Sequence, residues 1–313
     1  MEIRNENDKH KVVVVKVGQD DVEGMLINHD LRDDGFYTYM EKEFIDAVMN
    51  YLPEYAMGEE PLPASPLELV PYMRETAKSV IKIKKIEEIR KYIDDDVPYE
   101  DWDKGILDIY AKKGVFSELI LHFLLRTIKG TTPLISKIYF KDSFSHEAHG
   151  FDSVHVSDDR KLWLGETKFY SDGKSGVKAL IEDLKTHFKH DYLKDQFVII
   201  SRALVHKNPE REEWINTLNN AKRLEEKFDM VVVPMLCIYE DGIATEIMSA
   251  INRGTDADTI FFNHVSELKG YFDKNNDFAN KERVQTLLLL LPVECKKRIV
   301  SEMLSRICNM QNI

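Results

Sequence analysis

Apolar residues recur along this chain with two periods, one typical of strands and the other typical of amphipathic helices. Short runs rich in β-branched side chains, such as residues 11–17 before Gly18, predict strands. Longer segments in which apolar residues return every three or four positions predict helices, and residues 113–127 are strongly apolar among these. Strands are therefore predicted over residues 11–17, 24–30, 134–140, 150–156, 162–169, 196–203 and 230–239, and helices over residues 38–51, 70–93, 113–127, 175–190, 209–228, 256–271 and 280–310.

The order of these elements favours one class of fold. From residue 111 onward a helix precedes three strands, and helices then alternate with strands, which is typical of a mixed sheet flanked by helices. Five prolines between residues 53 and 71 predict a loop or a short-helix linker ahead of this region. We therefore expect an α/β (α+β) fold with an N-terminal α/β region and C-terminal helices.

Composition excludes several classes of protein. The length of 313 residues suits about two domains, and a hydrophobic share of 43% is too high for a disordered chain. No apolar run approaches the roughly 20 residues that a membrane-spanning helix needs, and the first residues are too polar for a signal peptide. Three scattered cysteines exclude a disulfide framework and a cysteine-based zinc site, so a reducing cytoplasm is the expected compartment.

The negative charge is concentrated in the first third of the chain. The net charge is −12, and residues 1–110 hold 14 basic and 26 acidic residues, so the remainder is balanced. An acidic surface repels nucleic acid. Residues 1–110 therefore either confer solubility, or shield a site or dock on a basic partner, and any contact with nucleic acid is expected from the rest of the chain.

One predicted strand, within residues 161–170, breaks its own apolar pattern. Leu162 and Leu164 share a face with Glu166 and Lys168, because alternate residues of a strand point the same way. Both faces begin apolar, which is typical of a central strand. Two charged side chains on such a strand cost desolvation energy unless they are paired or bind something.

A carboxylate on the preceding strand completes a set of three charges. A polar turn at residues 157–160 predicts a hairpin, which brings Asp152 close to Glu166 and Lys168. Two carboxylates hold Mg²⁺ well, and a neighbouring lysine can orient a water molecule and offset transition-state charge. The set therefore suits metal-dependent phosphodiester hydrolysis, although a structural salt bridge at a sheet edge is the alternative. The spacing alone is weak evidence, because Glu-x-Lys also begins at Glu225, Glu267 and Glu294, in or beside helical segments.

At these residues the sequence resembles the PD-(D/E)XK nuclease superfamily. More narrowly, the run HGFDSVHVSDDRKLWLGETKFY, followed by a helix with Lys178 and His187, resembles the HamA family of nuclease subunits from two-gene Hachiman anti-phage systems. That resemblance is close over residues 113–239 and loose in the first third. One departure is that Phe151 stands where the superfamily has its proline.

The resemblance implies a restriction-endonuclease-like core and Mg²⁺-dependent DNA cleavage, with Mn²⁺ as a substitute. It makes Asp152 and Glu166 the metal-binding acids, together with the backbone carbonyl of Thr167, and Lys168 the catalytic lysine. Glu118 fits the additional acid that many members carry on the helix before the sheet, and the alternative is a polar stripe on a half-exposed helix. The resemblance also implies a HamB-like helicase as the partner.

Other polar groups are weaker candidates. His146 and His149 lie three residues apart, which does not match the helical zinc motif, although His149 stays a candidate for lining a cleft near Asp152. Two basic groups could contact DNA phosphates or form ordinary solvated faces, and the second could also bind a partner. These groups are Lys178, Lys185 and Lys189 in the helix after the catalytic strand, and residues 296–298 with Arg306 in the last helix.

The expectation from the sequence is a cytoplasmic, Mg²⁺-dependent DNA endonuclease of bacterial defence, held in check and delivered to DNA by a helicase. Residues 1–110 form a regulatory or partner-docking region, 111–250 the nuclease core and 251–313 a C-terminal helical extension. Two alternatives stay open: a catalytically silent nuclease-like scaffold or sensor, and an RNA-cleaving enzyme with the same metal site. The presence of all three charged residues argues against a silent scaffold.

Overall fold

The computed structural model describes residues 11–58, 62–83, 85–136, 150–189, 196–197, 200, 228–278 and 281–312. Its strands are β1 (Val13–Gln19), β2 (Val22–Ile27), β3 (His29–Leu31), β4 (Tyr37–Tyr39), β5 (Thr132–Pro133), β6 (Ser153–Val156), β7 (Leu162–Tyr170), β8 (Val231–Tyr239) and β9 (Gln285–Pro292). Its helices are α1 (Glu41–Asn50), α2 (Leu52–Met57), α3 (Pro66–Val80), α4 (Ile86–Asp94), α5 (Lys104–Ala111), α6 (Val115–Thr127), α8 (Gly173–His187), α11 (Ile243–Arg253), α12 (Ala257–Asn275) and α13 (Lys296–Asn312), with a short 3₁₀ helix at Tyr99–Asp101.

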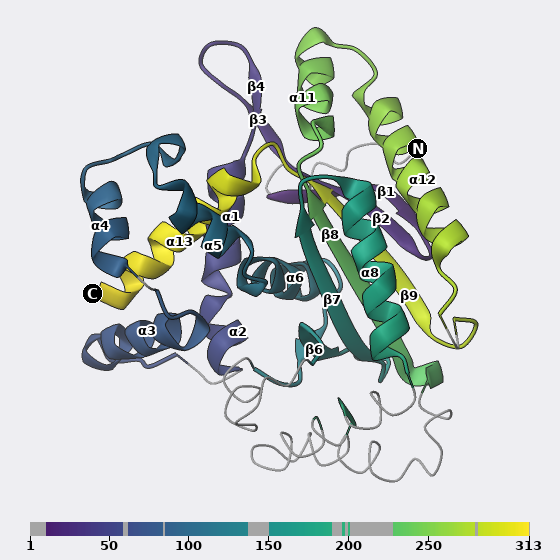
Figure 1. Ribbon diagram of the computed structural model, residues 1–313, viewed down its shortest axis with the longest axis horizontal. Coiled ribbons are helices and arrows are strands. Elements are labelled where there is room, and N and C mark those ends of the chain that lie inside the picture. The colour runs from purple at the N-terminus through teal and green to yellow at the C-terminus, as the bar shows by residue number, and fades with distance from the viewer. Residues whose placement is uncertain are drawn as a thin grey trace.

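Within the described residues, seven strands form one mixed sheet in the order β1-β2-β9-β8-β7-β6-β5. The central pairs β2–β9, β9–β8 and β8–β7 are parallel, and the outer pairs are antiparallel. Helices α1, α6 and α13 lie on one side of the sheet and α8 and α12 on the other (Figure 1). The expected mixed sheet flanked by helices is confirmed.

The central strands are buried on both faces, and each face contributes to a different core. Along β8, Leu236 and Ile238 join the core with α1, α6 and α13, whereas Met235 and Cys237 join the core with α8 and α12. All nine residues of β8 are buried, as expected for an interior strand of a parallel sheet. Every residue of α6 from Val115 to Leu125 is also buried, so this helix lies deep inside the molecule.

The prediction of a helix through residues 280–310 was wrong, because the leucine run at its start is strand β9. Leucine favours helices, but this run is short and ends at Pro292. Leu287, Leu289 and Leu291 face one core, and Leu288 and Leu290 face the other, so an unbroken apolar run suits a central strand. Only α13, which begins at Lys296, is helical in this part of the chain.

The boundaries of several other predicted elements also differ. Thr38 does not cap α1, because it pairs with Asp30 in the β3–β4 hairpin. The linker takes the short-helix alternative, because it contains α2 and the start of α3. Pro53 and Pro66 stand in first turns, where the N–H groups have no helical partner, and Pro71 lies inside α3. The helix expected over residues 70–93 is split into α3 and α4.

Three predicted elements fall largely outside the described residues. Of the strand expected at 196–203, only Gln196, Phe197 and Ile200 are described, and they are helical. The buried side chains of Phe197 and Ile200 are three positions apart, which suits one face of a helix. The helix expected at 209–228 and most of the strand expected at 134–140 also lie outside the described residues. In the described part of the chain, no helix is both long enough and apolar enough to cross a bilayer.

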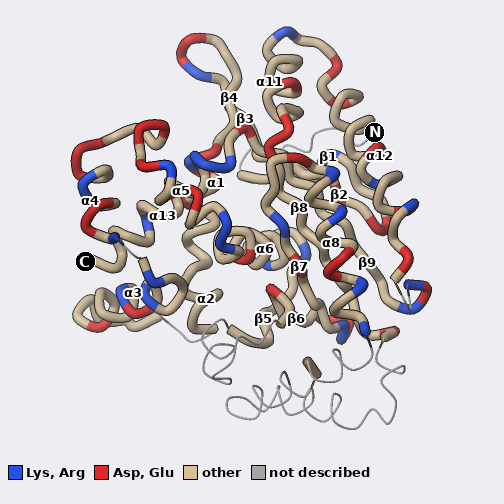
Figure 2. The backbone as a smooth tube through the Cα atoms, viewed as in Figure 1, with Lys and Arg blue, Asp and Glu red and all other residues tan. Residues whose placement is uncertain are grey.

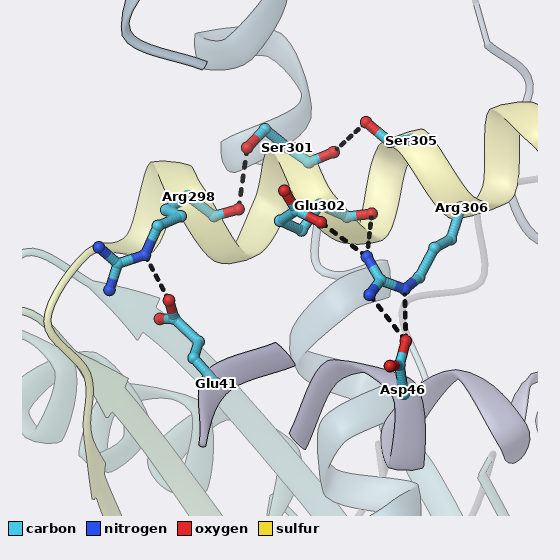
Figure 3. A network of polar contacts seen from close by, with 7 residues as sticks. All are labelled: Glu41, Asp46, Arg298, Ser301, Glu302, Ser305 and Arg306. Atoms are coloured by element: carbon cyan, nitrogen blue, oxygen red, sulfur yellow. Dashed lines mark hydrogen bonds and ion pairs between the residues drawn. The ribbon is translucent and has the colours of Figure 1, made fainter. Parts of the chain in front are cut away.

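The sheet takes strands from all three segments that the sequence distinguished, and ion pairs join the last segment to the first. Arg298 contacts Glu41, and Arg306 binds Asp46 with a shortest distance of 2.7 Å (Figure 3). These basic side chains of α13, proposed above as a DNA or partner surface, therefore contact acids of α1. The assignment of separate roles to the three segments stays a prediction.

Candidate active site

The candidate site lies where β7 continues past the end of its neighbour β6. In register, Ser153 pairs with Gly165, and the backbone N–H of Asp152 donates to the carbonyl of Gly165 at 2.9 Å. The predicted hairpin between residues 150–156 and 162–169 is therefore present. On the β6 side of β7, no described strand pairs with the residues that follow Gly165.

The carboxylate of Asp152 lies against the part of the β7 edge that has no pairing strand among the described residues. The Thr167 N–H donates to Asp152 Oδ2 at 2.8 Å. In a strand, the N–H and C=O of one residue point to the same edge, and so do the carbonyls of residues i and i+2. Because Gly165 also bonds toward β6, the Thr167 carbonyl points to the edge that Asp152 occupies. This is the orientation that a backbone ligand beside Asp152 requires.

A glycine allows three elements to meet at this point. A Cβ atom on Gly165 would lie 2.2 Å from Ser153 Oγ and 2.6 Å from Leu121 Cδ2. No side chain larger than hydrogen fits there without displacement. Gly165 therefore lets α6 and β6 pack closely against β7 just before the charged residues begin.

Helix α8 supplies a partner to each charged residue of β7. His187 Nδ1 lies 2.5 Å from Glu166 Oε1, and Lys168 forms an ion pair with Asp183. Asp183 and His187 are four residues apart, so both face β7 from one side of the helix. Sequence reasoning included His187 only as part of the resemblance and assigned no functional role to Asp183. Their shared i, i+4 spacing was the signal that could have identified them.

Phe151, which occupies the place of the superfamily's proline, supports this arrangement. Its buried ring contacts the His187 ring edge-to-face at a centroid distance of 5.6 Å, and it also contacts Phe188. An aromatic residue at this position therefore packs against the histidine that contacts Glu166.

Burial shifts the proton affinities of the charged residues. Glu166 is 2% exposed, and its burial and then the nearby charge of Asp183 raise its pKa well above the usual value. Burial, followed by repulsion from Glu166 and Glu118, likewise raises the pKa of Asp152, although the residue as a whole is partly exposed. Burial opposes the charge on Lys168, but the hydrogen bond and charge of Asp183 raise the pKa of its ammonium overall. The site thus holds two carboxylates that lack full compensation for their charge.

Glu118 reaches this site from α6, and a residue from the first third of the chain holds it. The Tyr55 hydroxyl donates to Glu118 Oε2 at 2.6 Å inside the protein. Burial and then the charge of Glu118 raise the pKa of Tyr55 well above its usual value, so the phenol stays protonated and can donate. Sequence reasoning missed Tyr55, because nothing in the pattern of residues 51–57 distinguishes it from an ordinary core aromatic residue.

The donor atoms fit a hard divalent cation. Carboxylate and carbonyl oxygens are the ligands that Mg²⁺ prefers, and two buried carboxylates that repel each other would be relieved by a cation between them. Within the described residues, no three Asp, Glu, His or Cys side chains are grouped to hold a metal ion. Asp152 accepts from Thr167, Glu166 contacts His187 and Glu118 accepts from Tyr55. The two carboxylates and the Thr167 carbonyl are oxygen donors of the kind that Mg²⁺ prefers.

The remaining predicted residues do not converge on this set. Lys178 and Lys189 are exposed on or just after α8, and Lys185 pairs with Asp277 at 2.6 Å. His146 and His149 lie outside the described residues, so nothing is added to their predicted roles.

A buried polar chain lies behind the site. His122 contacts Glu54 at 3.0 Å and His155 at 3.1 Å, and His155 contacts the Thr131 hydroxyl at 2.9 Å. Burial lowers the pKa of both histidines, that of His155 well below its usual value. Both are therefore neutral in the folded protein at neutral pH.

This burial predicts a pH effect on stability. The folded state keeps His155 neutral, whereas the unfolded chain takes up the proton below a pH of about 6.5. Acid therefore favours unfolding, by up to about 1.4 kcal/mol per pH unit for this one proton. We expect urea titrations between pH 7 and 5 to show wild type losing stability relative to His155→Gln, which cannot take up the proton. Parallel pH dependences for the two proteins would contradict the assignment.

Comparison with known proteins gives one match. The family model described as HamA matches residues 4–307, a range that includes every element of the site described above. Searches among curated proteins and among solved structures gave no significant match.

Proposed function

Because the chain belongs to the HamA family and is thus a component of Hachiman defence, we propose that it is a metal-dependent DNA endonuclease that acts with a helicase partner. The observation that carries the proposal is the edge of β7, where the Thr167 N–H holds Asp152 beside Glu166 and Lys168. This juxtaposition combines a metal-binding pair of acids with a protonated lysine.

Each residue has a distinct role in the proposed reaction. Asp152, Glu166 and the Thr167 carbonyl would hold the cation. When bound, a divalent cation supplies charge that polarises a phosphodiester and makes a water molecule more acidic. Lys168 stays protonated because of Asp183, so it can orient the attacking water and offset charge on the phosphate. Glu118, fixed by Tyr55, is an additional acid beside Asp152.

Control by a partner follows from the charge of the chain. A net charge of −12 gives the isolated chain little attraction for DNA, because protein affinity for nucleic acid depends mainly on cations that neutralise phosphates. A helicase that tracks along DNA would bring substrate to the site. Residues 1–110 are proposed to dock on that partner or regulate it. The setting proposed is the reducing cytoplasm, where the free cysteines Cys237, Cys295 and Cys308 would persist.

Plasmid digestion tests the proposed function. We expect the co-expressed complex of this chain with its helicase subunit to cut DNA in the presence of Mg²⁺, and the Lys168→Ala complex to cut about 10²- to 10³-fold more slowly. The chain alone should cut weakly at physiological salt. The same complex is also given an RNA of matched sequence, and cleavage of the RNA instead of the DNA would identify a ribonuclease.

The outcomes are distinct. Equal cutting by wild type and Lys168→Ala would show that the assigned lysine is wrong. No cutting of DNA or RNA by an intact complex would favour the silent scaffold.

A further inference from the structure

The β3–β4 hairpin projects from the end of the molecule opposite β6 (Figure 1). Its tip, residues 31–37, exposes three large apolar side chains: Leu31 is 53% exposed, Phe36 61% and Tyr37 39%. Exposed apolar side chains that lie together, unlike single ones, are typical of a surface that binds another molecule. No other seven-residue stretch of the described chain exposes three aromatic or aliphatic side chains that include two rings.

The hairpin is held in one conformation despite its position. A two-stranded hairpin alone is only marginally stable in water. Here the Arg32 N–H donates to the Phe36 carbonyl at 2.8 Å, and the Gly35 N–H donates to the Arg32 carbonyl at 2.9 Å. Gly35 has a φ of 83°, which favours glycine. Asn252 of α11 holds one side of the tip, because its side chain accepts from the N–H of Tyr37 at 2.6 Å and donates to the Tyr37 carbonyl at 3.0 Å. An anchored apolar tip loses little conformational entropy on binding, which favours affinity.

A hollow adjoins the base of the hairpin. It encloses about 210 Å³ between β1, β2, α11 and the start of α12. His29 lines it and also contacts the Tyr37 ring at 5.4 Å, so the hollow and the tip form a continuous surface. The apolar lining consists of Val14, Leu26, Ile247, Ile251 and Ala257, and the charged lining consists of Lys16, Asp256 and Asp258.

Charge indicates the kind of partner. Asp30, Asp33 and Asp34 are exposed and alternate along the chain with the apolar residues of the tip, and Arg32 is the basic residue among them. Figure 2 shows acidic and basic positions on this hairpin. A net negative rim repels DNA and attracts a basic protein surface.

We propose that the hairpin tip and the adjoining hollow form the docking surface for a partner protein that presents apolar side chains flanked by lysine or arginine. The inference rests on the proposed function in taking the helicase subunit as this partner. A partner bound at this end leaves the β6–β7 edge open to DNA, because the two lie at opposite ends of the molecule (Figure 1).

Binding of the purified helicase subunit to full-length chain, measured by interferometry at physiological salt, tests the proposal. We expect Phe36→Ser and Leu31→Ser each to weaken binding by about tenfold or more. The matched control is Ile109→Ser on α5, which is 53% exposed like Leu31 and should change affinity less than about twofold. Asp33→Lys with Asp34→Lys should slow association and weaken its dependence on salt. Circular dichroism of each variant checks folding.

Several results would overturn the docking surface. The proposal is wrong if all hairpin variants bind the helicase subunit with wild-type affinity. It is also wrong if the wild-type chain does not bind the helicase subunit. Sedimentation that shows a wild-type dimer and a Phe36→Ser monomer would assign the surface to a second copy of the chain instead. Failure of the proposed nuclease function gives a different result. In that case the wild-type complex would not cut DNA with Mg²⁺, but the hairpin variants would still bind the helicase subunit more weakly than wild type.

Discussion

Glu166→Gln should abolish metal-dependent DNA cleavage while making the metal-free protein more stable. Glutamine has the shape of glutamate, so the packing of this 2% exposed side chain is kept. It removes a negative charge that burial disfavours, and it removes one of the two carboxylates proposed to hold the cation. We expect cleavage by the complex with the helicase to fall by about 10³-fold.

The stability gain has a defined pH dependence. Burial raises the pKa of Glu166 in the folded state, whereas the unfolded carboxyl titrates at its ordinary value of about 4.3. The cost of the ionised side chain is therefore fully present above the folded-state pKa and disappears as the pH falls toward about 4.3. The advantage of Glu166→Gln should accordingly be largest at pH 8 and shrink in acid, as measured by urea unfolding without metal.

Added Mg²⁺ should reverse the order of stability of wild type and Glu166→Gln. Wild type should gain thermal stability with added Mg²⁺, because a ligand that binds only the folded state stabilises it, and Glu166→Gln should gain much less. The control is Glu182→Gln on α8, whose side chain is 62% exposed and which should match wild type in every measurement. Full cleavage activity in Glu166→Gln would exclude this residue from the reaction.

Gly165→Ala should destabilise the protein by about 3 kcal/mol. The added methyl group would lie 2.2 Å from Ser153 Oγ and 2.6 Å from Leu121 Cδ2, so β6 or α6 must move away from β7. Thermal and urea unfolding measure the loss. Because the displacement occurs beside Asp152, the helicase complex that carries Gly165→Ala should also cut DNA more slowly.

Two further variants test whether the close contacts at Gly165 cause the loss of stability. Gly270→Ala in α12 has no atom within 4 Å of the new Cβ, so it should stabilise the helix by up to about 1 kcal/mol. Adding Ser153→Gly to Gly165→Ala should restore part of the stability, because it removes the nearest clashing atom. An unchanged midpoint in Gly165→Ala would contradict the close approach of the three elements.

The parts of the site that could be predicted are local in sequence. Strand alternation and a polar turn were enough to bring Asp152 near Glu166 and Lys168, because a hairpin register depends on neighbouring residues. The side chains that hold these residues come from other elements. Tyr55 reaches Glu118 from 63 residues away and His187 reaches Glu166 from 21 residues away. Helical spacing shows that Asp183 and His187 share a face of their helix, but it does not show which strand that face meets.

The same limit explains the error at β9. Residues 285–292 form a strand only because β2 and β8 provide hydrogen-bond partners on both sides, and those partners lie far away in the chain. A short leucine run has no local signal that separates a buried strand from a helix.

The place of β9 between β2 and β8 affects how the chain acquires its structure during synthesis. Strands β2 and β8 cannot pair with β9 until residue 292 has left the ribosome, and such long-range pairing is intrinsically slow. A nascent or truncated chain that ends before Gln285 therefore has a gap in the middle of its sheet. The seven-stranded sheet, and with it the support for the β7 edge from the layers on both faces, is therefore complete only after residue 292 has been synthesised.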